Sequence, residues 1–103
     1  MTEVWTDYAE WQKDQISDYI YANFGERREL KFRKEVEQTI DMLLRYPNSG
    51  AIDPLFADRT KAYRSVIVGG RSKMVYFIDG DIIYIVAIWD CRQDPEDQAS
   101  WVE

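Results

Sequence analysis

The sequence contains no histidine and only one cysteine, Cys91, among its 103 residues. A lone cysteine excludes an internal disulfide framework, and without histidine we expect neither a zinc site nor histidine-based acid–base catalysis. No apolar run approaches the roughly 18 residues that cross a bilayer, and the chain does not open with a basic-then-apolar signal peptide. We therefore expect a cytoplasmic protein with no metal, no cofactor and no membrane partner.

Basic residues are also scarce, with 13 Lys and Arg against 19 Asp and Glu, a net charge of -6. Such a surface would not bind nucleic acid indiscriminately, because affinity for phosphates needs concentrated Lys and Arg. The positive charge is nevertheless clustered, since five basic residues and no acid lie between Arg59 and Ile78. At 46% hydrophobic and 15% aromatic content, the chain can bury a real core, and its length suits one domain, residues 1–103.

Two helices are predicted in the first half of the chain. After a short β-prone segment, Glu3–Trp5, either Thr6 or Asp7 can cap a helix. Apolar residues then recur at helical spacing on one face as far as Gly25: Tyr8, Trp11, Ile16, Tyr19, Ile20 and Phe24. The same spacing returns between Glu26 and Tyr46, before the Pro-Asn-Ser-Gly break at 47–50. Because Gly25 alone connects the two segments, they should form an antiparallel hairpin.

Three strands are predicted between residues 62 and 92, after a loop that ends at Lys61. Asp79-Gly80 is a strong signal for a two-residue hairpin turn, which pairs Val75 with Tyr84. The earlier turn at 69–72 gives the same assignment of faces whether its loop has two residues or four.

Alternation divides these strands into two faces. The first is nearly all apolar and should pack on the helical hairpin; it comprises Tyr63, Ser65, Ile67, Met74, Tyr76, Ile78, Ile83, Ile85, Ala87, Trp89 and Cys91. The second combines apolar residues with all the basic ones; it comprises Arg64, Val66, Val68, Arg71, Lys73, Val75, Phe77, Ile82, Tyr84, Val86, Ile88, Asp90 and Arg92. That face is either a second core with its cations at the rim or an interaction surface. Because it is too apolar to be left in water, we expect Trp101 and Val102 to cover part of it, or a partner chain to do so.

The order of strand, helical hairpin and three-stranded meander resembles the RelE/ParE superfamily of bacterial type II toxins. The matching phrases are ISDYIYANFGE at 16–26, YPNSG at 46–50 followed by Asp53-Pro54, Tyr63-Arg64-Ser65, and IYIVAIWDCRQDPE at 83–96. The last phrase is similar to ParE-side members, which often close this strand with histidine, one residue and arginine; here those positions hold Asp90 and Arg92. The resemblance implies an α+β fold, with an N-terminal strand and an antiparallel helical hairpin packed on an antiparallel β-sheet.

The resemblance also implies a growth-inhibiting toxin that a cognate antitoxin wraps and neutralises, in a hetero-oligomer. ParE-like members inhibit DNA gyrase and need no catalytic groups, whereas RelE-like members are metal-independent endoribonucleases that cleave mRNA on the ribosome. The ParE-like ending favours gyrase as the target. The alternative is a toxin fold that has lost toxicity and survives as a binding module for its antitoxin.

For a RelE-like nuclease, the matching positions are Arg64, Lys73 and Arg92. Cleavage by the neighbouring 2′-hydroxyl needs that group deprotonated, the phosphorane charge stabilised and the 5′-oxygen protonated. The two arginines would hold the charge, and Lys73 would contribute charge or a proton. A further lysine of those nucleases has no counterpart here, which leaves Asp90 and Tyr84 as substitute acid–base groups.

Overall fold

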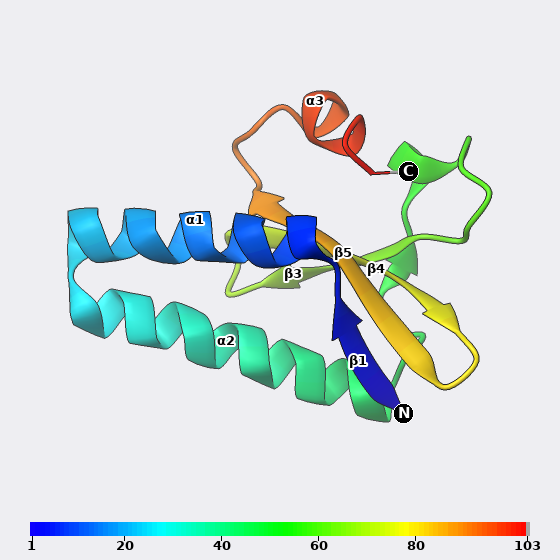
Figure 1. The fold of residues 1–103 in the computed structure, drawn as a ribbon, viewed down its shortest axis with the longest axis horizontal. Coiled ribbons are helices and arrows are strands. Elements are labelled where there is room, and N and C mark those ends of the chain that lie inside the picture. Colours follow the sequence, from blue (N-terminus) through cyan, green and yellow to red (C-terminus); the bar gives the residue numbers. More distant parts are fainter. Residues whose placement is uncertain (103) are drawn as a thin grey trace.

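The computed structural model describes residues 1–102 as an α+β fold with a five-stranded mixed sheet (Figure 1). In chain order the elements are β1 (Thr2–Trp5), α1 (Asp7–Phe24), α2 (Glu26–Arg45), β2 (Ala51–Ile52), the 3₁₀-helix η1 (Pro54–Phe56), β3 (Arg64–Val68), β4 (Ser72–Asp79), β5 (Ile82–Asp90) and α3 (Pro95–Ala99). The sheet order is β1-β5-β4-β3-β2, with β1 parallel to β5 and the other neighbours antiparallel. The predicted α+β class is confirmed, and residue 103 of the predicted single domain lies outside the described residues.

The helical hairpin follows its predicted boundaries. Thr6 caps α1 by accepting a hydrogen bond from the Ala9 N–H at 3.1 Å. Gly25 turns the chain with a φ of 89°, a backbone conformation that glycine adopts without strain. Glu29 of α2 ties the helices together, because its carboxylate accepts the Ser17 hydroxyl at 2.5 Å and pairs with Arg33 at 2.6 Å. Hydrogen bonds from Arg33 and then Ser17 lower the pKa of Glu29.

Helix α2 supplies most of the helical side of the first core. The buried residues of this core are Ala9, Phe32, Val36, Ile40, Leu43, Val68, Met74, Tyr76, Ile83, Ile85 and Ile88. Helix α1 behaves differently: Ile16 and Ile20 are partly buried, whereas Trp11, Tyr19 and Phe24 are 57%, 55% and 49% exposed. One edge of the predicted apolar stripe on α1 therefore stays uncovered by this chain. Neither α1 nor any other helix within residues 1–102 is long and apolar enough to span a membrane.

The predicted register between β4 and β5 is wrong. Tyr84 pairs with Phe77 rather than with Val75, because Asp79 pairs with Ile82 across the turn. A β-bulge between Val75 and Tyr76 then shifts the register once more. As a result Ala87 and Trp89 join the second face of the sheet, and Ile88 turns toward the helical hairpin.

The predicted face of β3 is also wrong. Val68 pairs with Ser72, so the loop between β3 and β4 has three residues rather than two or four. An odd loop reverses the alternation, which places Arg64 opposite Tyr76 on the hairpin side. Lys73 pairs with Trp89 and faces the other way. The common basic face predicted for these cations does not form.

Element η1 and the segment 95–102 cover the second face of the sheet (Figure 1). The buried residues of this second core are Phe56, Tyr63, Val75, Val86, Ala87, Trp89, Ala99 and Val102. Arg59 fixes the segment by donating hydrogen bonds to the carbonyls of Ala99 at 2.8 Å and Val102 at 3.2 Å. The predicted cover is thus confirmed for Val102, whereas Trp101 is 68% exposed.

The turn that follows α2 depends on one buried hydroxyl. Tyr76 is 0% exposed, and its hydroxyl donates to the Pro47 carbonyl at 2.7 Å and accepts the Gly50 N–H at 3.0 Å. Burial raises the pKa of Tyr76. A Cβ at Gly50 would lie 2.7 Å from this hydroxyl, so the close approach requires glycine.

Tyr76→Phe should lower the free energy of unfolding by about 1 to 3 kcal/mol, because two backbone groups lose their partner inside the fold. The measurement is urea denaturation of the purified chain. Tyr46→Phe is the matched control, since Tyr46 is 65% exposed, and it should change stability by less than about 0.5 kcal/mol. Equal effects of the two substitutions would refute the role of the buried hydroxyl.

Candidate interaction groove

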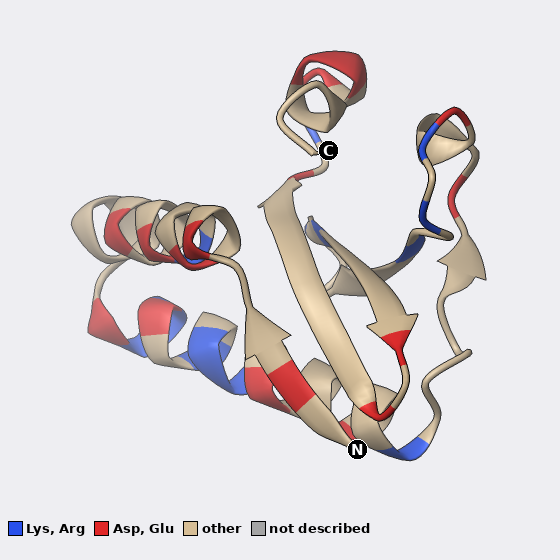
Figure 2. Cartoon of the chain, turned by 45° about the vertical axis from the view of Figure 1, so that its right-hand side comes forward, with Lys and Arg blue, Asp and Glu red and all other residues tan. Residues whose placement is uncertain are grey.

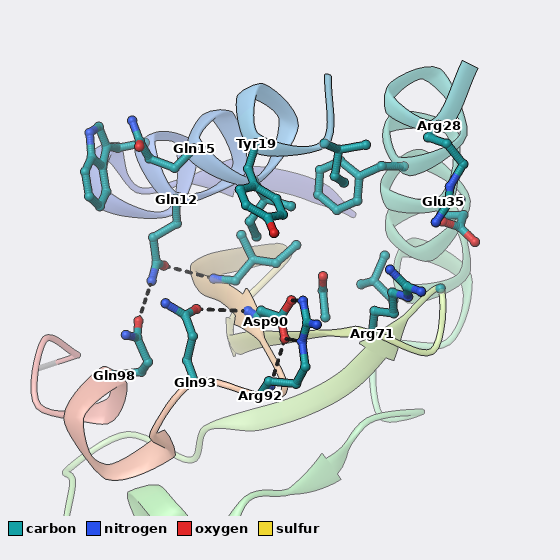
Figure 3. A pocket seen from close by; sticks show the side chains of 18 of the residues that line it. Gln12, Gln15, Tyr19, Arg28, Glu35, Arg71, Asp90, Arg92, Gln93 and Gln98 are labelled. Carbon is teal, nitrogen blue, oxygen red and sulfur yellow. Dashed lines mark hydrogen bonds and ion pairs between the residues drawn. The ribbon is translucent and has the colours of Figure 1, made fainter. Parts of the chain in front are cut away.

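A groove of about 1170 Å³ runs along the uncovered edge of α1 (Figure 3). Its walls come from α1, the first half of α2, the β3–β4 turn and the end of β5 with the segment that follows it. Trp11, Tyr19 and Phe24 all line it. Because these rings remain about half exposed, the groove is an apolar surface of the kind that marks an interaction site.

One end of the groove is aromatic. The ring of Tyr8 stacks between those of Trp11 and Trp101, with centroid distances of 6.0 and 6.1 Å. Burial, and then the nearby Asp97 carboxylate, raise the pKa of Tyr8. The two tryptophans keep more than half of their surface exposed, so this aromatic row is open to a partner.

The buried Gln12 joins the wall of the groove to the sheet. Its side-chain oxygen accepts the Ile88 N–H at 3.0 Å, at a point on β5 beyond the end of β1. Its amide nitrogen donates to the Gln98 side chain at 3.2 Å (Figure 3). Gln12 therefore completes the backbone bonding of β5 and holds the segment after it beside α1.

The other end of the groove is basic. Arg28, Glu35 and Arg71 lie at that end, away from Gln12 and Gln98 (Figure 3). In all, four cations and two carboxylates line the groove: Arg28, Lys31, Arg71 and Arg92 against Glu35 and Asp90. This excess of positive charge is local, because the chain carries -6 overall and acidic residues mark α1 and α3 (Figure 2).

Two of the predicted site residues, Asp90 and Arg92, meet in this groove. The guanidinium of Arg92 donates to both carboxylate oxygens of Asp90, at 3.0 and 2.8 Å. These hydrogen bonds, with a weaker contribution from Arg71, hold the pKa of Asp90 below its usual value. An ionised carboxylate held in this way is a poor proton donor or acceptor near neutral pH.

Lys73 lies on the second face of the sheet, away from this pair. Its ammonium is 2.5 Å from a carboxylate oxygen of Asp53 and lies 5.5 Å from the centre of the Trp89 ring. Burial alone would raise the pKa of Asp53, but hydrogen bonds from Lys73, the Leu55 N–H and Ser65 lower it. Lys73 is therefore engaged in an internal ion pair.

The remaining two predicted residues occupy other places. Arg64 donates to the carbonyls of Gly50 at 2.7 Å and Asn48 at 3.3 Å, and so braces the turn after α2. Tyr84 stacks on Phe77 at 4.9 Å on the second face. All five predicted site residues lie within the described residues, and among them Asp90 and Arg92 are the only two that contact each other.

The sequence predicts an apolar helix face for Trp11 and Tyr19, whereas the structure leaves both side chains half exposed in the groove. One signal was present: Ala9 and Gln12 stand three residues apart, and they are the buried positions of α1. A small residue and an amide on the inner face of a helix leave its large aromatic residues on the flank.

Comparison with known proteins identifies the family. A profile of the ParE toxin of type II toxin-antitoxin system, parDE, matches residues 4–95. The fold is similar to a solved structure, the chromosomal ParDE TA system from P. aeruginosa, with a TM-score of 0.70 and 22% identity over 87% of this chain and 95% of that chain. A comparison with curated protein sequences found no match. The chain belongs to the ParE toxin family of type II toxin-antitoxin systems.

Proposed function

We propose that this ParE-type toxin stops growth by binding DNA gyrase, and that it does not cleave mRNA on the ribosome. The observation that supports this target is the separation of the candidate catalytic residues. Arg64 and Lys73 lie on opposite sides of the sheet, and Arg92 lies in the groove beyond β5. A toxin that acts by binding needs no such assembly.

RNA cleavage would need a base, an acid and a charge-stabilising group around one phosphate. Lys73 is held by Asp53, and Arg92 is held by Asp90. Tyr84 packs on Phe77 on the second face of the sheet. The net charge of -6 also opposes a close approach to the dense phosphates of a ribosome.

The antitoxin is the partner that belongs with this family. The groove along α1 suits a polypeptide occupant, because exposed tryptophan, tyrosine and arginine are the residues enriched in protein–protein interfaces. We therefore assign the groove to the antitoxin in the neutralised complex.

The test compares the two targets directly with the purified chain. With gyrase and relaxed plasmid we expect loss of supercoiling and accumulation of cleaved DNA. In a translating extract we expect intact messages. Messages cut at the ribosomal A site would support the nuclease instead. If neither target responds and induced expression leaves growth normal, the non-toxic binding module is the better description.

Arg92→Gln sharpens this comparison, because the Arg92 side chain is 76% exposed and its loss should leave the fold intact. A nuclease that used this arginine on its phosphate would lose about 100-fold or more in rate. For a toxin that acts by binding, one rim residue should change gyrase inhibition by less than about tenfold. Arg27→Gln, on the exposed side of α2 outside the groove, is the matched control. A loss near 100-fold for Arg92→Gln alone, with stability unchanged, would contradict the binding mechanism.

A further inference from the structure

The segment 94–102 is built with a fixed side and a free side. On the fixed side, Ala99 and Val102 are buried in the second core, and Arg59 holds both of their carbonyls. Asp94 begins the short helix by accepting the Glu96 N–H at 3.0 Å. On the free side, Trp101 is 68% exposed and stacks on Tyr8 at the rim of the groove. The segment thus presents one large aromatic side chain on a rigid support.

Most of this segment, residues 96–102, lies outside the part of the chain that matches the ParE profile. The match ends at residue 95, where α3 begins. Trp101 and Gln98 therefore add to the groove from a region that the family profile does not cover, while Trp11 and Tyr8 lie within it. Because the groove combines residues from inside and outside the matched region, it can distinguish between partners that the matched region alone would bind equally.

The basic end limits the chemistry of the occupant. Arg71 is exposed, and within residues 1–102 no ion pair joins it or Lys31 to a carboxylate. Arg28 lies over the Phe24 ring at 5.1 Å. An occupant with carboxylates at the basic end and apolar side chains at the aromatic end would be complementary to the groove in charge and in polarity. A nucleic acid fits less well, because Glu35 and Asp90 also line the groove and acidic residues mark α1 and α3 (Figure 2).

We propose that the segment 94–102 is the partner-selecting wall of the groove. Trp101 and Trp11 hold the apolar side of an acidic, amphipathic segment of the antitoxin, and the carboxylates of that segment lie on Arg71 and Lys31. This inference rests on the proposed function in one respect, the assignment of the groove to the antitoxin, and it is independent of the gyrase target.

The experiment measures affinity by calorimetry between the purified chain and the purified product of the open reading frame beside its gene. Trp101→Ala should weaken binding about tenfold or more, as truncation of a large aromatic anchor does. Tyr21→Ala is its control, because Tyr21 is 61% exposed on α1 but does not line the groove. Arg71→Glu should weaken binding about 30-fold or more, since it places like charges together. Arg27→Glu is the control for that reversal. Both controls should stay within about threefold of the unmodified chain.

A second measurement separates this inference from the proposed function. At matched expression the antitoxin should rescue growth from Tyr21→Ala as it does from the unmodified chain, and it should rescue growth less well from Trp101→Ala. If the unmodified chain leaves gyrase active, and Trp101→Ala nevertheless weakens antitoxin binding, the proposed gyrase target is wrong and the role of the segment 94–102 is supported. If Trp101→Ala and Arg71→Glu bind as tightly as their controls, or if the unmodified chain does not bind this product, the inference is overturned. Tighter binding of a single-stranded oligonucleotide than of the product, lost on Trp101→Ala, would overturn it as well.

Discussion

Asp53→Asn should lower the free energy of unfolding by about 3 kcal/mol, because it leaves the Lys73 ammonium on the sheet without its carboxylate. Both members are shielded, with side-chain exposures of 5% for Asp53 and 21% for Lys73. The measurement is urea denaturation near neutral pH. Asp41→Asn, at an exposed position of α2, is the control and should cost less than about 0.5 kcal/mol.

The double variant Asp53→Asn/Lys73→Met should recover part of that loss. Methionine has an unbranched, apolar side chain that can pack on Trp89, and no unpaired charge then remains. A double-mutant cycle isolates the energy of the pair. A single-variant cost below about 1 kcal/mol would show that the ion pair contributes little to folding.

The same pair predicts how stability depends on pH. Because the folded pKa of Asp53 is lowered from 3.8, the unfolded chain takes up the proton first as the solution is acidified. The contribution of this carboxylate is complete above its unfolded pKa and is lost as the pH falls through the folded value. The free energy of unfolding, measured by urea denaturation at a series of pH values from neutral to about pH 3, should therefore fall less steeply with decreasing pH for Asp53→Asn than for the unmodified chain.

Trp89→Ala should have the largest effect on stability, about 3 to 5 kcal/mol. Trp89 is 2% exposed, and its ring lies 6.4 Å from that of Phe56 in the second core. The exposed Trp101 provides the matched control, since Trp101→Ala should cost less than about 1 kcal/mol. Thermal and urea unfolding of the two variants give the comparison.

Hydrogen exchange on Trp89→Ala tests the effect of the β-bulge. Because the bulge turns Trp89 toward η1 and the segment 95–102, amides of those two elements should lose protection first. Amides of the helical hairpin should keep most of theirs. Early loss of protection in α1 and α2 would instead mean that Trp89 packs on the hairpin, as the sequence alone predicted.

The structure contains no shared face for the candidate catalytic residues within residues 1–102, and it contains a groove along α1. Two of the residues that resemble a nuclease set hold the fold, since Arg64 braces a turn and Lys73 pairs with Asp53. The third, Arg92, is exposed and pairs with Asp90. The uncovered surface is instead the aromatic edge of α1 with the basic residues beside it. This arrangement suits a toxin whose work is done through protein contacts.

Some of the site could be predicted, and the rest could not. Asp90 and Arg92 are two residues apart at the end of a strand, so their contact follows from local geometry. The distance between Arg64 and Lys73 depends on loop length and strand register, which alternation of side chains does not determine. A single residue added to a loop or a strand moves each later side chain of that strand to the opposite side of the sheet.

The sequence by itself determined the α+β class, the boundaries of the helical hairpin and the toxin superfamily. These depend on local signals: helical periodicity, the single glycine at 25, the turn residues and the matching phrases. Only the tertiary structure decided which side of the sheet each side chain occupies and which edge of α1 stays open. Both are decided by a three-residue loop, one β-bulge and the packing of Gln12 against β5, and no periodicity in the chain encodes these. The groove formed in this way, and not the basic residues read along the strands, is the surface on which a partner is expected to bind.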